Sequence, residues 1–280
     1  MQRIRMMLAS LPKGRPVVGV VGLAVVLACS KEQPVEQKLA PTAAALEAAM
    51  PKAASAQAFV VDPSSSSLTF LMDSPLEKID GDAPQSISGD LFIDPSDLAK
   101  STALVKADLK LLTLYQQKRG DDKEAYGART KSDLQNEHAR GWLELDAKDG
   151  EVTSAQAETN RFAELKILKL ENPSVSDVTK LTGAERKVTA TAVGELRLHG
   201  RKATKSAKVE LTFKYEGDKL QSVAVRNFEP FSIQLEEFEI HPRDAAGKLV
   251  KKLSDALSSN LKGKVAADAP VNVSFVAKPK

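Results

Sequence analysis

Hydrophobic and polar residues alternate with a period of two through most of the chain after residue 58. The alternating segments are residues 67–72, 87–94, 103–112, 188–198, 207–215 and 271–277, with shorter strand-like runs at 59–61, 165–170, 220–226 and 231–235. Successive side chains of a strand point to opposite faces, so this pattern predicts strands with one apolar and one polar face. The pattern therefore predicts a mainly β domain with at least eight antiparallel strands.

Two segments have the spacing of helices instead. Residues 131–143 place Leu134, His138 and Trp142 four positions apart, which puts them on one helical face. Residues 245–261 place four leucines at the same spacing, and a glycine follows shortly after. A family of antiparallel strands with two inserted helices predicts a closed or nearly closed barrel, because closure removes strand edges that would otherwise pair with other chains.

Small residues gather on the predicted inward face of the barrel. Ala190, Ala192 and Gly194 follow one another on that face, and Ala107 and Ala207 add to it. A barrel of about eight strands either fills its interior with side chains or encloses one small ligand, and the sequence leaves both alternatives open. If a ligand is enclosed, the walls are predicted to include Phe70, Leu109, Ala192, Leu196, Leu211, Phe213 and Phe275.

The N-terminal 28 residues have the order of a secretory signal. Four basic residues come first, an uncharged apolar stretch follows at residues 17–28, and Ala28 closes it. The apolar stretch is shorter than the ~20 residues that span a bilayer. The next residue, Cys29, is the only cysteine of the chain, so it has no partner for an intramolecular disulfide.

The order Val26-Leu27-Ala28-Cys29 resembles the bacterial lipobox, whose cysteine becomes the first mature residue and carries lipid. That resemblance implies acylation of Cys29, palmitate included, and a membrane anchor. The alternative is an ordinary signal peptide or membrane anchor with an incidental cysteine. Ser30 stands where an aspartate would favour inner-membrane retention in enteric bacteria, so an outer-membrane location facing the periplasm is expected in preference to the inner membrane.

Residues 29–57 hold several prolines and alanines and no aromatic residue, which predicts a disordered tether, with a transient helix at residues 42–49. The barrel domain is then expected at residues 58–280. Loss of residues 1–28 removes four of the 40 basic residues and leaves 36 against 37 acidic ones. A nearly neutral mature chain lacks the basic excess of a nucleic-acid-binding protein.

The sequence contains no arrangement typical of an enzyme or a metal centre. Its three histidines, His138, His199 and His241, lie far apart, and it has no HExxH, CxxC or P-loop motif. We therefore expect no catalytic residue, no cofactor and no metal. His199 is interpreted as a turn residue, and His138 is expected to pack with Trp142.

Several stretches of the barrel domain follow one another in a recognisable order: FVVDPSSSSLTF, SGDLFIDPSDLAKSTALVKADL, NEHARGWLEL, GELRLHGRKATKSAKVELTF and VNVSFVAKPK. In this order they resemble the YceI family of bacterial periplasmic and secreted proteins. The resemblance implies a lipocalin-like antiparallel barrel of about eight strands whose interior binds a polyisoprenoid or another long apolar lipid. One position departs from the family pattern, because Ser65 stands where a histidine is common.

Two functions from different classes follow. The first is a membrane-tethered lipoprotein of the bacterial cell envelope whose barrel binds an apolar lipid. The second is a structural or partner-binding module of the envelope whose barrel is filled by its own side chains. The sequence determines neither the ligand nor the oligomeric state.

Overall fold

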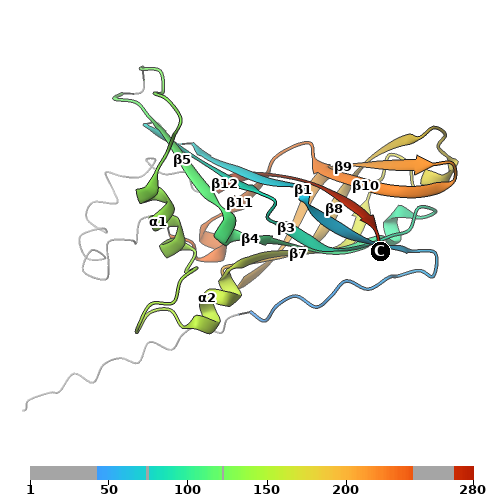
Figure 1. The fold of residues 1–280 in the computed structure, drawn as a ribbon, viewed down its shortest axis with the longest axis horizontal. Coiled ribbons are helices and arrows are strands. Elements are labelled where there is room, and N and C mark those ends of the chain that lie inside the picture. The colour runs from blue at the N-terminus through green and yellow to red at the C-terminus, as the bar shows by residue number, and fades with distance from the viewer. Residues whose placement is uncertain (1–42, 74–75, 122, 242–267) are drawn as a thin grey trace, which may run out of the picture. The chain divides into compact units, whose positions relative to one another are not determined.

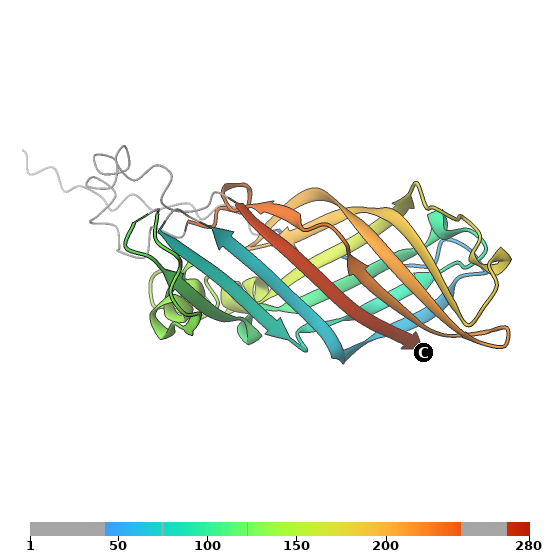
Figure 2. The same cartoon turned by 90° about the horizontal axis from the view of Figure 1, so that it is seen from above.

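A closed antiparallel barrel is the centre of the structure (Figures 1 and 2). The computed structural model describes residues 43–73, 76–121, 123–241 and 268–280. The strands are β1 (Gln57–Asp73), β2 (Glu77–Pro84), β3 (Ile87–Ile93), β4 (Thr102–Asp108), β5 (Thr113–Lys118), β6 (Thr130–Lys131), β7 (Phe162–Glu171), β8 (Glu185–Leu198), β9 (Arg201–Glu216), β10 (Lys219–Asn227), β11 (Phe231–Gln234) and β12 (Asp268–Pro279). The sheet order is β11-β12-β10-β9-β8-β7-β4-β3-β1-β2-β5-β6, and pairing of β12 with β1 closes a ring of eight strands. The predicted barrel is confirmed.

Three strand paths are bent and continue past the closed ring, those of β2 with β3, of β4 with β5 and of β10 with β11. The path of β2 and β3 bends at Gln85, which has a φ of 58°. The path of β4 and β5 bends at the 3-10 helix η2 (Leu109–Leu111), where the Asp108 carboxylate accepts a hydrogen bond from the Lys110 N–H. We expected residues 103–112 to be one strand, and this was wrong. The strand ends at Asp108, and the turn leaves Leu111 48% exposed.

The helices lie together at one end of the barrel, here called the helical end (Figure 1). They are α1 (Asp133–Trp142) and α2 (Ser154–Asn160). The first confirms the helix predicted at residues 131–143. The second was missed, although its capping box of Thr153 and Gln156 was readable in the sequence. The helix predicted at residues 245–261 lies outside the described residues.

Helix α1 is held to the barrel by an asparagine that imitates a strand partner. The Asn136 carboxamide accepts a hydrogen bond from the Leu114 N–H at 2.8 Å and donates one to the Leu114 carbonyl at 3.0 Å. His138 and Trp142 contact each other as expected, with ring centroids 5.9 Å apart, whereas Leu134 is 59% exposed. None of the helices in the described part of the chain has the length and apolarity needed to cross a membrane.

The barrel interior contains two apolar clusters. The larger fills the end away from the helices and includes Phe59, Phe213 and Val223, each fully buried. The smaller closes the helical end with Leu196, Phe238 and their neighbours. The ring-strand residues that give the cavity described below its apolar lining belong to the larger cluster or pack against it.

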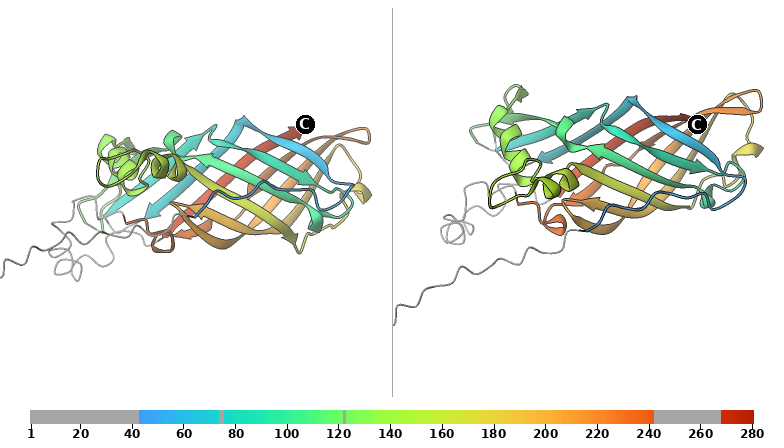
Figure 3. Two further views of the ribbon diagram at one scale, coloured as in Figure 1. Left: turned by 90° about the horizontal axis from the view of Figure 1, so that it is seen from below. Right: turned by 60° about the horizontal axis from the view of Figure 1, so that its bottom comes forward.

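The chain before β1 forms an extended strap along the outside of the barrel wall (Figure 3). Its residues 43–56 contain neither helix nor strand, yet Leu46 and Ala49 are buried against Leu104 of β4. We expected a disordered tether up to residue 57 and a transient helix at 42–49. The described part, residues 43–56, lies against the barrel instead, because its apolar side chains cover an outward-facing leucine.

A buried group of charged side chains fastens this strap. The Glu164 carboxylate of β7 accepts a hydrogen bond from the Leu46 N–H at 2.8 Å and pairs with Lys106 at 2.7 Å and with Arg197 at 3.3 Å. Arg197 in turn donates to the Ala43 carbonyl at 3.0 Å. Each charge of the buried Glu164–Arg197 pair therefore also binds the strap, which satisfies groups that would otherwise be costly to bury.

Candidate functional site

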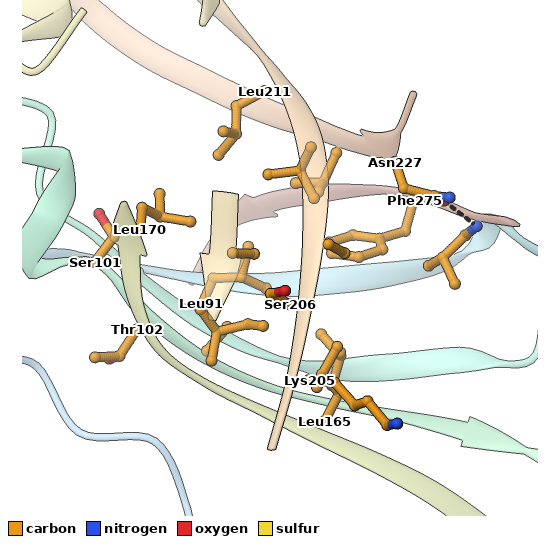
Figure 4. Close-up of a pocket in the computed structure, with 18 of the residues that line it drawn as sticks. Leu91, Ser101, Thr102, Leu165, Leu170, Lys205, Ser206, Leu211, Asn227 and Phe275 are labelled. Carbon is orange, nitrogen blue, oxygen red and sulfur yellow. Dashed lines mark hydrogen bonds between the residues drawn. The ribbon is translucent and has the colours of Figure 1, made fainter. Parts of the chain in front are cut away.

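The inward faces of the ring strands enclose an apolar cavity of about 100 Å³ (Figure 4). Strand pleating supplies the side chains that line this cavity, because alternate residues of each strand point inward. Seven of the ring strands contribute to its apolar lining: Leu91, Ile93, Ala103, Val105, Leu165, Ile167, Leu170, Ala192, Ala207, Val209, Leu211, Val225, Val273 and Phe275. Such a surface offers dispersion contacts to an apolar guest and few hydrogen bonds to water.

Two of the small residues noted in the sequence create part of this space. Ala192 of β8 and Ala207 of β9 lie directly opposite each other in the strand register, and both line the cavity. Gly194 is small for another reason. A Cβ there would lie 2.1 Å from the Lys166 carbonyl oxygen of β7, so the glycine permits the close approach of two strands.

The structure divides the seven predicted ligand-binding residues among four places. Ala192, Leu211 and Phe275 line the cavity. Phe213 is fully buried in the larger cluster, and Phe70 and Leu196 belong with the cluster at the helical end.

Leu109 occupies the fourth place, at the border of the cluster at the helical end. It lines a separate hollow of about 210 Å³ beneath α1. The seven residues all face the interior side of the fold, but strand bends and register separate them along the barrel.

Lys205 is a cavity-lining residue that the sequence analysis overlooked. It lies on the inward phase of β9, between Ala203 and Ala207, and its side chain is only 18% exposed. Its ammonium forms an ion pair with Glu237 and lies 5.5 Å from the ring centroid of Phe238. The period of two in residues 207–215, extended back by one step, would have placed this lysine inside the barrel.

Asn227 is a second lining residue that was overlooked. Its side chain accepts a hydrogen bond from the Val273 N–H at 2.6 Å and donates to the Val271 carbonyl at 3.0 Å (Figure 4). It thereby replaces the backbone pairing between β10 and β12 where the strand path bends toward β11.

The histidines have structural positions. His199 and Gly200 form the two-residue turn between β8 and β9, with φ values of 48° and 65°, which confirms His199 as a turn residue. The His199 Nδ1 lies 2.9 Å from the Phe238 carbonyl, and Nε2 lies 3.4 Å from Glu144. Hydrogen bonding from His199 lowers the pKa of Glu144 in spite of its partial burial. Among the described residues, no group of His, Cys, Asp and Glu side chains is arranged to hold a metal ion.

The residues around Ser65 shape a strand irregularity outside the cavity. Asp62 accepts hydrogen bonds from Lys278 and from Ser64, which lower its pKa to about 2. Ser66 accepts a hydrogen bond from the Ile87 N–H at 3.1 Å and so joins the irregularity in β1 to the start of β3. Neither Asp62 nor Ser66 lines the cavity.

Comparison with known proteins finds matches among solved structures. No family model matches the chain, and no curated protein matches it. One similar solved structure is a polyisoprenoid binding domain from Saccharophagus degradans implicated in plant cell wall breakdown, with 15% identity, 80% of this chain and 99% of that chain covered, and a TM-score of 0.47. Another is BcnA from Burkholderia cenocepacia, with 15% identity, 78% and 99% covered, and a TM-score of 0.42.

Proposed function

We propose that this barrel binds the apolar chain of a lipid, a polyisoprenoid being the class that the YceI resemblance implies. The observation that carries the proposal is the cavity of about 100 Å³, whose lining is almost entirely apolar. An apolar cavity of about 150 Å³ in another protein stays dry and binds benzene, so a cavity of this order accepts a small apolar group. Transfer of such a group from water is favourable in proportion to the area buried.

The cavity volume limits the length of the lipid chain that can bind without rearrangement. Sites for drug-sized ligands measure roughly 300–1,000 Å³, so a chain of several isoprene units needs more room than the present cavity of about 100 Å³. A longer chain would have to displace side chains between the two clusters. Leu196 and Phe70 at the helical end would then contact its far part, which agrees with their place in the predicted set.

The size of the cavity also favours the second function, a structural or partner-binding module. Phe59, Phe213 and Val223 occupy the interior with no exposure at all. A barrel that keeps this packing has no room for a long ligand and acts through its surface. No catalytic step is proposed for either function.

The second part of the proposal concerns the membrane. Cys29 lies outside the described residues, and its acylation is proposed from the lipobox resemblance. The strap supports a definite orientation, because the Ala43 N–H donates to the Gly200 carbonyl at 2.9 Å, at the helical end of the barrel. The 14 residue-to-residue steps from Cys29 to Ala43 span at most ~50 Å. In this proposal the helical end faces the membrane, with the outer membrane and its periplasmic face preferred.

The first experiment is a search for bound lipid. The full chain is produced in a bacterium, the mature protein is purified without detergent exchange, and native mass spectrometry is combined with organic extraction. The lipid-binding proposal expects an added mass that extraction removes and that fragments as an isoprenoid. A protein that carries no lipid and takes up no added retinol, a fluorescent isoprenoid alcohol, would contradict it and leave the filled barrel.

A further inference from the structure

The barrel wall contains a seam at which neighbouring strands are not joined by backbone hydrogen bonds. Strand β10 pairs with β9 as far as Asn227, opposite Val209. Beyond that point the path bends and continues as β11, which pairs with β12. Within the described chain, no backbone ladder joins residues 201–207 of β9 to β11.

Charged side chains cross the seam in place of the missing ladder. Lys208 pairs with Glu229 at 2.9 Å at one end of the seam. Lys205 pairs with Glu237 in its middle. At the other end, Arg201 pairs with Glu239.

The apolar cavity reaches this seam. Lys205, Ser206 and Ala207 line the cavity from the β9 side, and Asn227 and Phe231 line it from the opposite side (Figure 4). Ser206 is exposed to solvent and also borders the cavity. The space inside the barrel and the solvent are therefore separated here by side chains alone.

We propose that this seam is the lateral entrance for the apolar chain, and that the Lys205–Glu237 ion pair is the latch that closes it. Between neighbouring strands of the closed ring, passage of a chain would break a ladder of backbone hydrogen bonds. At the seam it requires only the separation of partly exposed ion pairs, which contribute little to stability. The inference rests on the proposed lipid-binding function and identifies how the ligand enters.

Lys205 combines an apolar stem with a charged end. The apolar stem of Lys205 lines the cavity while its ammonium lies at the rim with Glu237. Separation of the pair turns the ammonium toward solvent and leaves an apolar wall for the entering chain. Lys205→Met removes the charge and keeps a stem of similar length, so it opens the latch without enlarging the cavity.

The test measures the release of retinol from the full mature protein into an excess of phosphatidylcholine vesicles by stopped-flow fluorescence. Lys205→Met and Glu237→Gln are each expected to accelerate release about two- to fivefold, the effect of losing one partly exposed ion pair. The exchanged pair, Lys205→Glu with Glu237→Lys, is expected to restore slow release. Arg226→Met is the control, because it removes an Arg226–Glu210 ion pair between strands that a backbone ladder joins.

Salt provides an independent readout. Raising sodium chloride from about 50 mM to about 500 mM screens exposed charges, so it should accelerate release from the wild-type protein more than from Lys205→Met, which keeps only the pairs at the two ends of the seam. Failure of wild-type protein to bind retinol would overturn the lipid-binding function together with the entrance. Normal binding with release rates unchanged in both latch variants would overturn the entrance alone.

Discussion

The guanidinium of Arg197 and the carboxylate of Glu164 meet at 3.3 Å on the outer wall of the barrel, and each side chain is only 3% exposed. The two residues lie directly opposite each other on β8 and β7. The strap shields both side chains from solvent. Arg197 donates a hydrogen bond to the strap, and Glu164 accepts one from it. The pair therefore couples the stability of the barrel wall to the position of the chain that leads to Cys29.

Arg197→Met is expected to destabilise the domain by ~3 kcal/mol, because it leaves a buried carboxylate short of one partner while Lys106 still neutralises it. Urea unfolding followed by circular dichroism measures this loss. The control is Arg226→Met, which removes an equally placed cross-strand pair whose arginine is 56% exposed. That change should cost less than ~1 kcal/mol. Equal costs for the two variants would show that burial under the strap adds nothing.

Acid is expected to loosen the strap through Glu164. Burial alone would raise the pKa of this carboxyl, but hydrogen bonds from Lys106 and the Leu46 N–H, with the charges of Lys106 and Arg197, hold the pKa below its ordinary value of 4.5. A lowered pKa contributes stability that is present above pH 4.5 and lost as pH falls through the folded-state pKa.

The stability difference between the wild-type protein and Glu164→Gln should therefore be constant above about pH 5.5 and shrink below about pH 4.5. The protection factors for hydrogen exchange of residues 43–56 should fall in the wild-type protein over the same range. A difference that did not depend on pH would exclude a role for the ionised carboxylate.

Ala192→Phe tests whether the cavity is a ligand site. Filling the space should abolish retinol binding at a cost below ~1 kcal/mol if the cavity accepts the new ring, whereas overpacking of a solid core costs ~1–3 kcal/mol or more. Ala190→Phe, two residues away on the same face but outside the cavity lining, is the matched control and should be the more destabilising. The measurements are fluorescence titration and melting temperature on one sample. Retained retinol binding in Ala192→Phe would place the ligand elsewhere.

Gly194→Ala should destabilise the barrel by ~1–3 kcal/mol, because the added Cβ would lie 2.1 Å from the Lys166 carbonyl oxygen and the strands must separate. Gly141→Ala is the contrasting substitution, since a Cβ in this turn of α1 meets no atom within 4 Å. It should be neutral or stabilise the protein by up to ~1 kcal/mol through helix propensity. Thermal unfolding of the two variants measures these changes in stability. An unchanged stability of Gly194→Ala would refute the close approach of the strands.

Cys29→Ala should move the protein from the membrane fraction to the soluble fraction and abolish labelling with radioactive palmitate. The barrel should keep its melting temperature, because the substitution lies outside the strap and the strands. Ser30→Ala controls for the change of a neighbouring residue and should remain in the membrane fraction. Membrane association that survived Cys29→Ala would exclude the lipoprotein hypothesis.

The sequence by itself determined which side chains face the interior. Strand geometry fixes a period of two, so Ala192, Leu211 and Phe275 could be placed inside the barrel without knowledge of any neighbour. The period of two supplied the strands of the antiparallel barrel, and a spacing of four supplied helix α1. The prediction of one strand over residues 103–112 failed at Asp108. The carboxylate of Asp108 caps the turn η2 there, and the turn ends the strand.

Only the tertiary structure decided which inward residues share one space. Phe70, Leu109 and Leu196 have the correct phase, yet strand bends place them outside the cavity lining. The pairing of Lys205 with Glu237, 32 positions away in the chain, depends on the path of β11 after Asn227. The strap was likewise unpredictable, because Leu46 is stabilised by a wall that local composition does not encode. Side-chain direction is set within a strand, whereas depth in the barrel and partners across it are set by pairing between distant segments.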